Sequence, residues 1–414
     1  MNPLRTLLAP WAVGAVVLCA VAVLADEAAD RISRLEDELR IAPDHGGVLF
    51  RLARERALQG DAAGSVRDLG LAVATGLDFE IEVESAFLPL RNRRDFMDVL
   101  DRALDQRLVV RSSSVAFRVN ESDLIPEGLA HDPVSGDFFL GSINRRKIVR
   151  IGPDGKARDF TTSGQDGLSE VLGMKVDAKR RRLWVMTAAG QAAGAQEGWS
   201  AAYAYDLGSG QVAQRYPLNT GKHLFNDIVL AADGRGFLTD SEAGAVWRID
   251  PGKDALVPLV PARRLTYANG IALSADERRL YVADFASGIS IVDPATGEVR
   301  PLPHPPDVSL HGIDGLYWHE SGLIGVQNGA GVERIVRYRL GPDGSKVVGL
   351  DVLESHNPLF AIPTTGAIVG GDFYYIANSL VDRIGPDGRL KPHARLEPAV
   401  ILKVSLGPAT AALR

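Results

Sequence analysis

Four polar residues occupy the same point of a repeated sequence unit, and they are the strongest candidates for chemistry in this chain. They are Glu127, Asn226, Asn269 and Asp314. Each stands directly before a short apolar run of the kind that forms a β-strand. Their side chains offer carboxylate and amide oxygens, which suit Ca²⁺ or Mg²⁺, and the set contains no imidazole or thiolate for zinc or copper.

The repeated unit indicates the fold that must position these side chains. Two weaker copies open at Leu172 and Thr365, which gives six units with a period of roughly 45 residues. A second β-rich run follows each opening, and turn residues separate the two runs. Because no helical pattern intervenes, we predict a six-bladed β-propeller over residues 114–408. A strand at 115–119 is expected to close the ring beside the last sheet, near 400–404.

The propeller gives the common register a physical meaning. The first strand of each blade lines the central channel, so residues that open different blades meet at one mouth of that channel. We therefore predict a Ca²⁺ site formed by Glu127, Asn226, Asn269 and Asp314, with Mg²⁺ or another hard divalent cation as the alternative. Four donors are fewer than the six to eight that calcium takes, so about two or more positions stay open for water or substrate.

A second interpretation of the same residues is turn chemistry. Asn or Asp before Gly is common in turns, and any one of the four residues taken alone is explained in that way. Turn preference does not explain why charge or amide recurs at one register in four of the six units. The joint pattern favours the metal site.

Further polar residues are expected around the channel mouth. Strands within a blade are antiparallel, so second strands end at the face where first strands begin. Two histidines each precede a candidate ligand by three residues. The alternative for all of them is a capping or loop role. The candidate substrate-binding residues are Asn226, Ser142, Asp240, Asp284, Gln327, Asn328, His223 and His311.

Composition favours a small-molecule partner. The chain has 414 residues and a formal net charge of −6. No basic run is available to neutralise phosphates, which argues against nucleic acid.

The first 25 residues look like a targeting segment. Arg5 precedes an apolar run at 7–25, as in an export signal, and the run is also long enough to be a retained membrane anchor. We expect a periplasmic or secreted protein, anchored to the membrane if the segment is kept. The single cysteine, Cys19, lies in this run, so the rest of the chain offers no disulfide.

Residues 26–110 have apolar residues at helical spacing and predict a helical segment. Within it, Leu49, Leu52, Ala53, Ser65, Leu69 and Ala72 resemble one tetratricopeptide unit, with a turn at 60–61. The alternative is a helical pair that packs on the neighbouring domain, because a single unit buries too little core alone. This segment is a candidate surface for a protein partner.

The motifs of the propeller carry a family resemblance. The segments 126–128, 226–227, 267–271 and 313–316 resemble the senescence marker protein, gluconolactonase and luciferin-regenerating enzyme family, over roughly 121–379. The resemblance implies one divalent metal, usually Ca²⁺, held by Glu127, Asn269 and Asp314, while Asn226 binds substrate or metal. It also implies hydrolysis of sugar lactones or related esters.

Two points of mechanism follow from this resemblance. Asp314 is the general base that it suggests. Apart from the resemblance, Asp227 is a second candidate because it stands next to Asn226, and its alternative is a structural partner for the neighbouring loop. The segments 225–228 and 268–271 are also similar to paraoxonases, which place a catalytic histidine where this chain has Leu172. A histidine-dyad mechanism is therefore not expected.

We predict an exported, calcium-dependent lactonase or esterase in which the metal polarises the carbonyl and orients water. The alternative is a non-catalytic propeller that binds a partner or a small ligand and holds at most a structural calcium. The fold alone does not choose between the two.

Overall fold

The computed structural model describes residues 28–189, 199–385 and 388–407. The chain divides into two compact units, one ending at Gln106 and one starting at Arg107, and each is described by itself. The predicted targeting segment, 1–25, lies outside the described residues. Within the described residues, no helix has both the length and the apolar character needed to cross a membrane.

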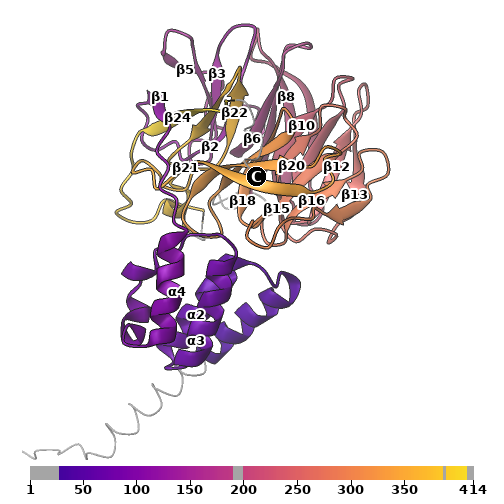
Figure 1. The fold of residues 1–414 in the computed structure, drawn as a ribbon. Coiled ribbons are helices and arrows are strands. Elements are labelled where there is room, and N and C mark those ends of the chain that lie inside the picture. Colours follow the sequence, from indigo (N-terminus) through magenta and orange to yellow (C-terminus); the bar gives the residue numbers. More distant parts are fainter. Residues whose placement is uncertain (1–27, 190–198, 386–387, 408–414) are drawn as a thin grey trace, which may run out of the picture. The chain divides into compact units, whose positions relative to one another are not determined.

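The first unit is helical (Figure 1), as the sequence predicts. The side chain of His45 caps α2 by accepting a hydrogen bond from the Val48 amide at 3.3 Å, and Asp61 caps α3 through the Gly64 amide at 2.9 Å. The six residues of the suggested tetratricopeptide unit are all buried, while that assignment itself stays a prediction. The helices are 28–41, α2 (Gly46–Leu58), α3 (Ala62–Ala74), η1 (Ile81–Val83), η2 (Ser85–Leu90) and α4 (Arg94–Asp105).

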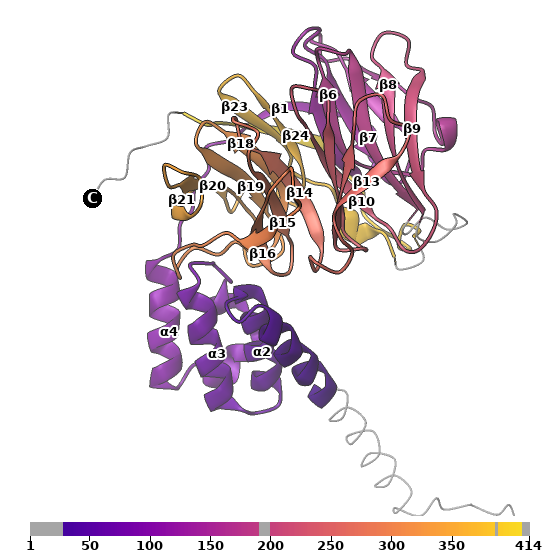
Figure 2. The ribbon, with the colours of Figure 1, turned by 90° about the vertical axis from the view of Figure 1, so that its right-hand side faces the viewer.

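The second unit is a six-bladed β-propeller, so the predicted fold class is confirmed (Figures 1 and 2). Each blade is an antiparallel sheet of four strands. The innermost strands are β2 (Pro126–His131), β6 (Glu170–Asp177), β10 (Phe225–Leu230), β14 (Ala268–Leu273), β18 (Ile313–His319) and β22 (Gly366–Val369). Each innermost strand contacts those of both neighbouring blades, so the six surround one channel.

The remaining strands complete the blades outward from the channel. The second strands are β3 (Phe138–Ser142), β7 (Arg182–Ala189), β11 (Gly236–Asp240), β15 (Leu280–Asp284), β19 (Gly322–Gln327) and β23 (Asp372–Ile376). The third strands are β4 (Ile148–Ile151), β8 (Trp199–Asp206), β12 (Ala245–Ile249), β16 (Gly288–Val292), β20 (Arg334–Leu340) and β24 (Ala399–Ser405). The outer strands are β5 (Ala157–Asp159), β9 (Val212–Leu218), β13 (Leu256–Val260), β17 (Val299–Pro301), β21 (Val347–Ser355) and β1 (Ser114–Val119). Short 3₁₀ turns lie at η3 (Gln165–Gly167) and η4 (Val381–Arg383).

Ring closure joins the two ends of the propeller sequence. Strand β1 pairs antiparallel with β24, from Ser114 opposite Lys403 to Val119 opposite Ala399. The last blade therefore contains the first strand of the unit, as the sequence predicts. This arrangement fixes the inner strand β22 beside β2 and completes the channel.

The core lies between neighbouring blades. Tyr281 in β15 and Tyr338 in β20 belong to one buried cluster that spans the fourth and fifth blades. The Tyr281 hydroxyl donates to the Gly344 carbonyl of the neighbouring blade at 2.8 Å, which satisfies its polar atom inside the core. Large side chains between sheets thus fix the angular position of each inner strand.

Candidate functional site at the channel mouth

A β-bulge lies at the start of five of the six inner strands. Pairing with the second strand shifts register between Pro126 and Leu129, and equivalent shifts occur in β6, β10, β14 and β18. The two residues inside a bulge leave regular pairing, and a bulge turns a side chain away from its normal direction. Glu127, Asn226, Asn269 and Asp314 are each the first of the two. One backbone irregularity thus aims all four at the channel mouth.

The glycine that follows three of the candidate ligands is required by close packing. A Cβ atom at Gly128 would lie 2.0 Å from the Leu172 carbonyl oxygen, and one at Gly270 would lie 2.3 Å from that of Asp314. At Gly315 the nearest backbone atom, the Thr364 carbonyl oxygen, is 2.9 Å away. None of the three has a positive φ angle. The turn interpretation therefore does not explain these Asn-Gly, Asp-Gly and Glu-Gly pairs, whereas the approach of the next inner strand does.

We expect Gly270→Ala to destabilise the propeller, because the new methyl group meets backbone of the neighbouring blade. Overpacking of this kind costs about 1–3 kcal/mol. Chemical denaturation of the variant measures the free energy of unfolding. Gly371→Ala is the matched control, since no atom lies within 4 Å of its added Cβ. Equal stability of the two variants would show that the inner strands separate freely.

The four candidate ligands are buried and connected to one another. Their exposed fractions are 8 % for Glu127 and Asn226, 6 % for Asn269 and 7 % for Asp314. Asn269 hydrogen-bonds to the Asp314 carboxylate. The Asn226 amide donates to Ser241 Oγ at 3.1 Å, and this hydroxyl donates to the Ala268 carbonyl at 2.6 Å. Residues from three blades thus meet around the start of β14.

Glu127 and Asp314 repel each other in this buried position. Burial raises the pKa of Glu127 well above its usual value, and the charges of Asp314 and Asp227 raise it further, although a hydrogen bond from Thr364 acts in the opposite direction. Burial likewise raises the pKa of Asp314 to about 6, although hydrogen bonds from Asn328 and Asn269 act in the opposite direction. Glu127 Oε2 is buried and has no hydrogen-bond partner in the described part of the chain. These oxygens fit a hard cation, which would supply the missing partner.

A cation at the channel mouth would need amide oxygens as ligands in addition to carboxylates. Within the described residues, no group of three or more His, Cys, Asp and Glu side chains is arranged to hold a metal ion. A cation at the mouth would therefore depend on the amide oxygens of Asn226 and Asn269 as well as on the two carboxylates.

Asp227 occupies the position that glycine takes in the neighbouring blades. Its Oδ1 accepts from the Ile228 amide at 2.8 Å, and its Oδ2 accepts from the Ile271 amide at 3.4 Å. Burial raises its pKa, and the charge of Lys175 lowers it. Because both oxygens face backbone amides, Asp227 connects β10 to β14, whereas Asp314 is bonded by side-chain amides at the mouth. This geometry favours Asp314 as the base.

Asn328 directly contacts a candidate ligand. Its amide nitrogen donates to Asp314 Oδ2 at 2.7 Å and to the Pro363 carbonyl at 2.8 Å. These bonds fix the orientation of the Asp314 carboxylate.

Ser142, Asp240, Asp284 and Gln327 share a different arrangement. Each is the last residue of a second strand, is at most 1 % exposed and bonds to backbone of the loop before the inner strand. Asp240, for example, accepts from the Leu224 amide at 3.0 Å, and Asp284 accepts from the Tyr267 amide at 3.1 Å. Gln327 donates to the His311 carbonyl at 2.7 Å. The observed role of these groups is to hold the loops that lead to the ligands; a substrate contact stays a prediction.

The two histidines of the mouth are held in place. His223 Nδ1 lies 2.6 Å from Asp240 Oδ2, and its Nε2 lies 2.8 Å from the Thr220 carbonyl oxygen. Both ring nitrogens thus face acceptors. His311 is 2 % exposed. Proton transfer by His223 would first require one of these two hydrogen bonds to break.

Part of the propeller matches a known protein family. Residues 125–291 match the family model described as "SMP-30/Gluconolactonase/LRE-like region". The propeller contains an SMP-30/Gluconolactonase/LRE-like region. The resemblance expected from the sequence motifs is thereby confirmed. This region includes Glu127, Asn226 and Asn269, while Asp314 lies beyond its end.

Solved structures of several kinds match most of the propeller. A gluconolactonase from Xanthomonas campestris is 17 % identical, with 72 % of this chain and 98 % of that chain covered at a TM-score of 0.48. A luciferin-regenerating enzyme is 15 % identical, with coverage of 71 % and 94 % and a TM-score of 0.49. A PQQ-bound aldose sugar dehydrogenase from Streptomyces coelicolor is 16 % identical, with coverage of 71 % and 98 % and a TM-score of 0.48. No match is found among curated protein sequences.

The SMP-30/Gluconolactonase/LRE-like region also holds Tyr267, a residue that sequence reasoning did not select. Burial raises the pKa of its phenol to about 12, and the charges of Glu242, Asp314 and Glu127 contribute to this. The phenol therefore stays protonated at neutral pH beside two candidate ligands. In the sequence, the one indication of a role for Tyr267 is its position two residues before the candidate ligand Asn269.

Proposed function

We propose that this chain is a hydrolase of lactones or related esters that depends on a divalent cation, with Ca²⁺ as the first choice. Glu127, Asn226, Asn269 and Asp314 would hold the cation. The observation that carries the proposal is the Glu127 carboxylate, which is buried near Asp314 and has an oxygen without a partner among the described residues. The SMP-30/Gluconolactonase/LRE-like region supports the lactonase class of reaction.

The side chains at the mouth divide the chemistry between them. A bound cation would polarise the substrate carbonyl and orient water. The Asp314 carboxylate accepts a proton from the attacking water while Asn328 holds its Oδ2. The hydroxide oxygen bonds to the carbonyl carbon, the ester C–O bond breaks, and the leaving alkoxide takes up a proton to give the hydroxy acid. The protonated phenol of Tyr267 provides a donor for a substrate oxygen.

The remaining parts of the chain carry separate proposals. Residues 1–25 would direct export to the periplasm or beyond, as a cleaved signal or a retained anchor; cell fractionation of the full chain tests this, and a purely cytosolic product would exclude it. The helical unit would bind a protein partner, supported by its exposed apolar side chains Ile41, Leu58 and Val83.

Removal of the cation is expected to change both stability and turnover. Protein purified without chelator should contain about one calcium per chain by elemental analysis, and a free calcium level of 100 times Kd should stabilise folding by about 2.7 kcal/mol. Hydrolysis across a panel of lactones and aryl esters should disappear with chelation and return with added calcium.

Each other result of this experiment has a defined meaning. Calcium that stabilises folding without any hydrolysis in the panel would support the alternative of a binding propeller with a structural cation. The cation proposal fails if chelation changes neither the unfolding midpoint nor the rates.

A further inference from the structure

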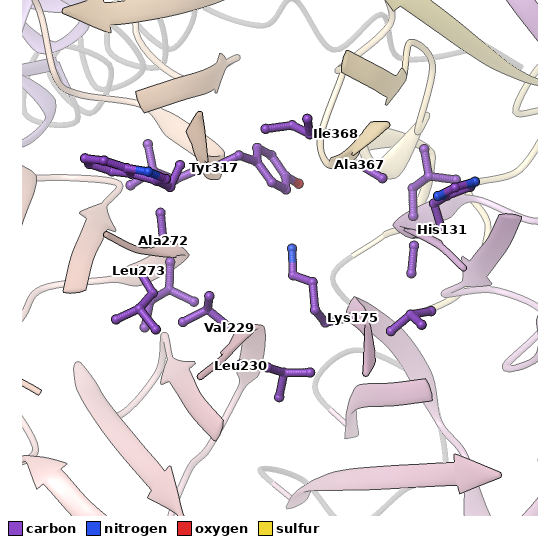
Figure 3. Close-up of a pocket in the computed structure, with 15 residues that line it drawn as sticks. His131, Lys175, Val229, Leu230, Ala272, Leu273, Tyr317, Ala367 and Ile368 are labelled. Carbon is purple, nitrogen blue, oxygen red and sulfur yellow. The ribbon is translucent and has the colours of Figure 1, made fainter. Parts of the chain in front are cut away.

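A cavity of about 380 Å³ occupies the channel beyond the candidate ligands. All six inner strands line it (Figure 3). In the five inner strands that have a bulge, the lining residues come after it, as from Leu129 to His131 in β2 and from Leu316 to Trp318 in β18. His131 and Trp318 are partly exposed, so the cavity opens where the inner strands end. It is therefore separate from the mouth at which these strands begin.

The repeat register identifies a second ring of residues in this cavity. Each member lies three residues after the opening residue of its unit, which corresponds to at most about 10 Å along the channel. Four members are apolar, one is a lysine and one is a tyrosine. The ring consists of Ala130, Lys175, Val229, Ala272, Tyr317 and Ile368.

Lys175 brings an ammonium group to the centre of these apolar walls. Its Nζ lies 5.0 Å from the centroid of the Tyr317 ring. Among the described residues, no hydrogen bond joins it and no carboxylate lies within 4.0 Å of it. Burial lowers the pKa of Lys175, and the charge of Asp227 acts in the opposite direction. The cavity thus contains an ammonium group that lacks a direct anionic partner.

Tyr317 provides a second donor beside Lys175. Its hydroxyl oxygen accepts from the Gly366 amide at 2.7 Å, which leaves the phenolic hydrogen to donate. In Figure 3 the Lys175 nitrogen and the Tyr317 oxygen both point toward the middle of the cavity. Two donors near the middle of an apolar cavity match the two oxygens of one carboxylate.

We propose that this end of the channel binds a small monocarboxylate with an apolar body. The carboxylate would contact the Lys175 ammonium and the Tyr317 hydroxyl, and the body would lie against Val229, Leu230 and Leu316. The Lys175 charge disfavours a cationic ligand. A ligand with several negative charges is disfavoured because the Asp227 charge influences Lys175. The charges of Asp227, Asp314 and Glu127 all influence Tyr317. None of the candidate cation ligands lines the cavity.

The binding test uses the chelated protein, so that no cation at the mouth can hold a carboxylate. Butyrate, hexanoate and benzoate are titrated by calorimetry, with the corresponding amides and amines as neutral and cationic probes. We expect each carboxylate to bind at least about tenfold more tightly than its amide, as a charge-assisted bond implies. Lys175→Met should lose at least about tenfold in carboxylate affinity. Lys179→Met, at an exposed site of the same blade, should change nothing.

Three results would overturn the proposal: no carboxylate binds, an amide or amine binds as tightly as its carboxylate, or Lys175→Met keeps full affinity. Val229→Phe is a second variant, which narrows the cavity without changing the charge of Lys175. It should weaken benzoate binding. If Lys175→Met does not fold, the comparison of carboxylate with amide on the unchanged protein still decides. The binding test is done with the cation removed by chelator, so a negative result does not affect the hydrolase proposal. Failure of the hydrolase proposal likewise does not affect the proposed carboxylate site.

Discussion

Asp314→Asn is expected to lower kcat for lactone hydrolysis by about 10²–10⁴-fold, the usual contribution of a general base. The amide keeps an oxygen that can face a cation, but it cannot take a proton from water. KM should change much less, because the variant alters neither the shape of the mouth nor the other candidate ligands. Steady-state kinetics at saturating calcium measures the two constants separately.

The pH profile gives the same prediction a second readout. Burial raises the pKa of Asp314 to about 6, so the fraction of ionised base increases as the pH rises through that value. A bound cation would move this acidic limb to lower pH. The native enzyme should therefore show a rate that rises with pH, and the limb should be missing from Asp314→Asn.

The control for this variant is Asp307→Asn, which removes an exposed carboxylate shortly before the same inner strand. It should leave kcat, KM and the acidic limb unchanged. An Asp314→Asn enzyme that keeps both its rate and its limb would remove Asp314 from the role of base and would turn attention to Asp227.

The register of the repeat explains why the fold could be predicted from sequence. The polar residue, the glycine and the apolar run recur because the same bulge opens the inner strand in five of the six blades. Gly128 and Gly270 look like turn residues in the sequence, yet they are small because a carbonyl of the next blade lies against them. The closing strand 115–119 was predictable too, since a ring needs a partner for its last sheet.

The direction of the remaining polar side chains could not be predicted in this way. Antiparallel pairing puts Asp240 and Asn328 at the same end of the propeller, but a side chain there can turn to the channel or to its own loop. Asp240 turns to the Leu224 amide, whereas Asn328 reaches Asp314. Strand alternation leaves this choice open because both residues stand at strand ends. Lys175 could not be predicted as a binding residue, because its unit opens with the apolar Leu172 and so has no polar residue at the opening position.

Glu127→Gln is expected to change stability in opposite directions with and without calcium. In the chelated protein, Glu127 is a buried acid whose folded-state pKa is well above 4.5 because of burial and the charges of Asp314 and Asp227. The unfolded chain gives up this proton more readily, so the ionised carboxylate costs stability as the pH rises above about 4.5. Glutamine removes that cost. The chelated variant should therefore be the more stable protein at pH 7, and the two should converge below pH 4.

Calcium should reverse the order. At a free calcium concentration of 100 times Kd, the free energy of unfolding of the native protein would increase by about 2.7 kcal/mol. The variant has one carboxylate less, so its free energy of unfolding should increase far less. Its rate of hydrolysis should fall by at least about 100-fold. Glu298→Gln, at an exposed position, is the control and should show neither effect. A Glu127→Gln protein that is less stable when chelated, or that gains as much from calcium, would mean that Glu127 has its own partner in the protein. In that case the carboxyl group is structural, because a residue kept to hold a cation must cost stability when the cation is absent.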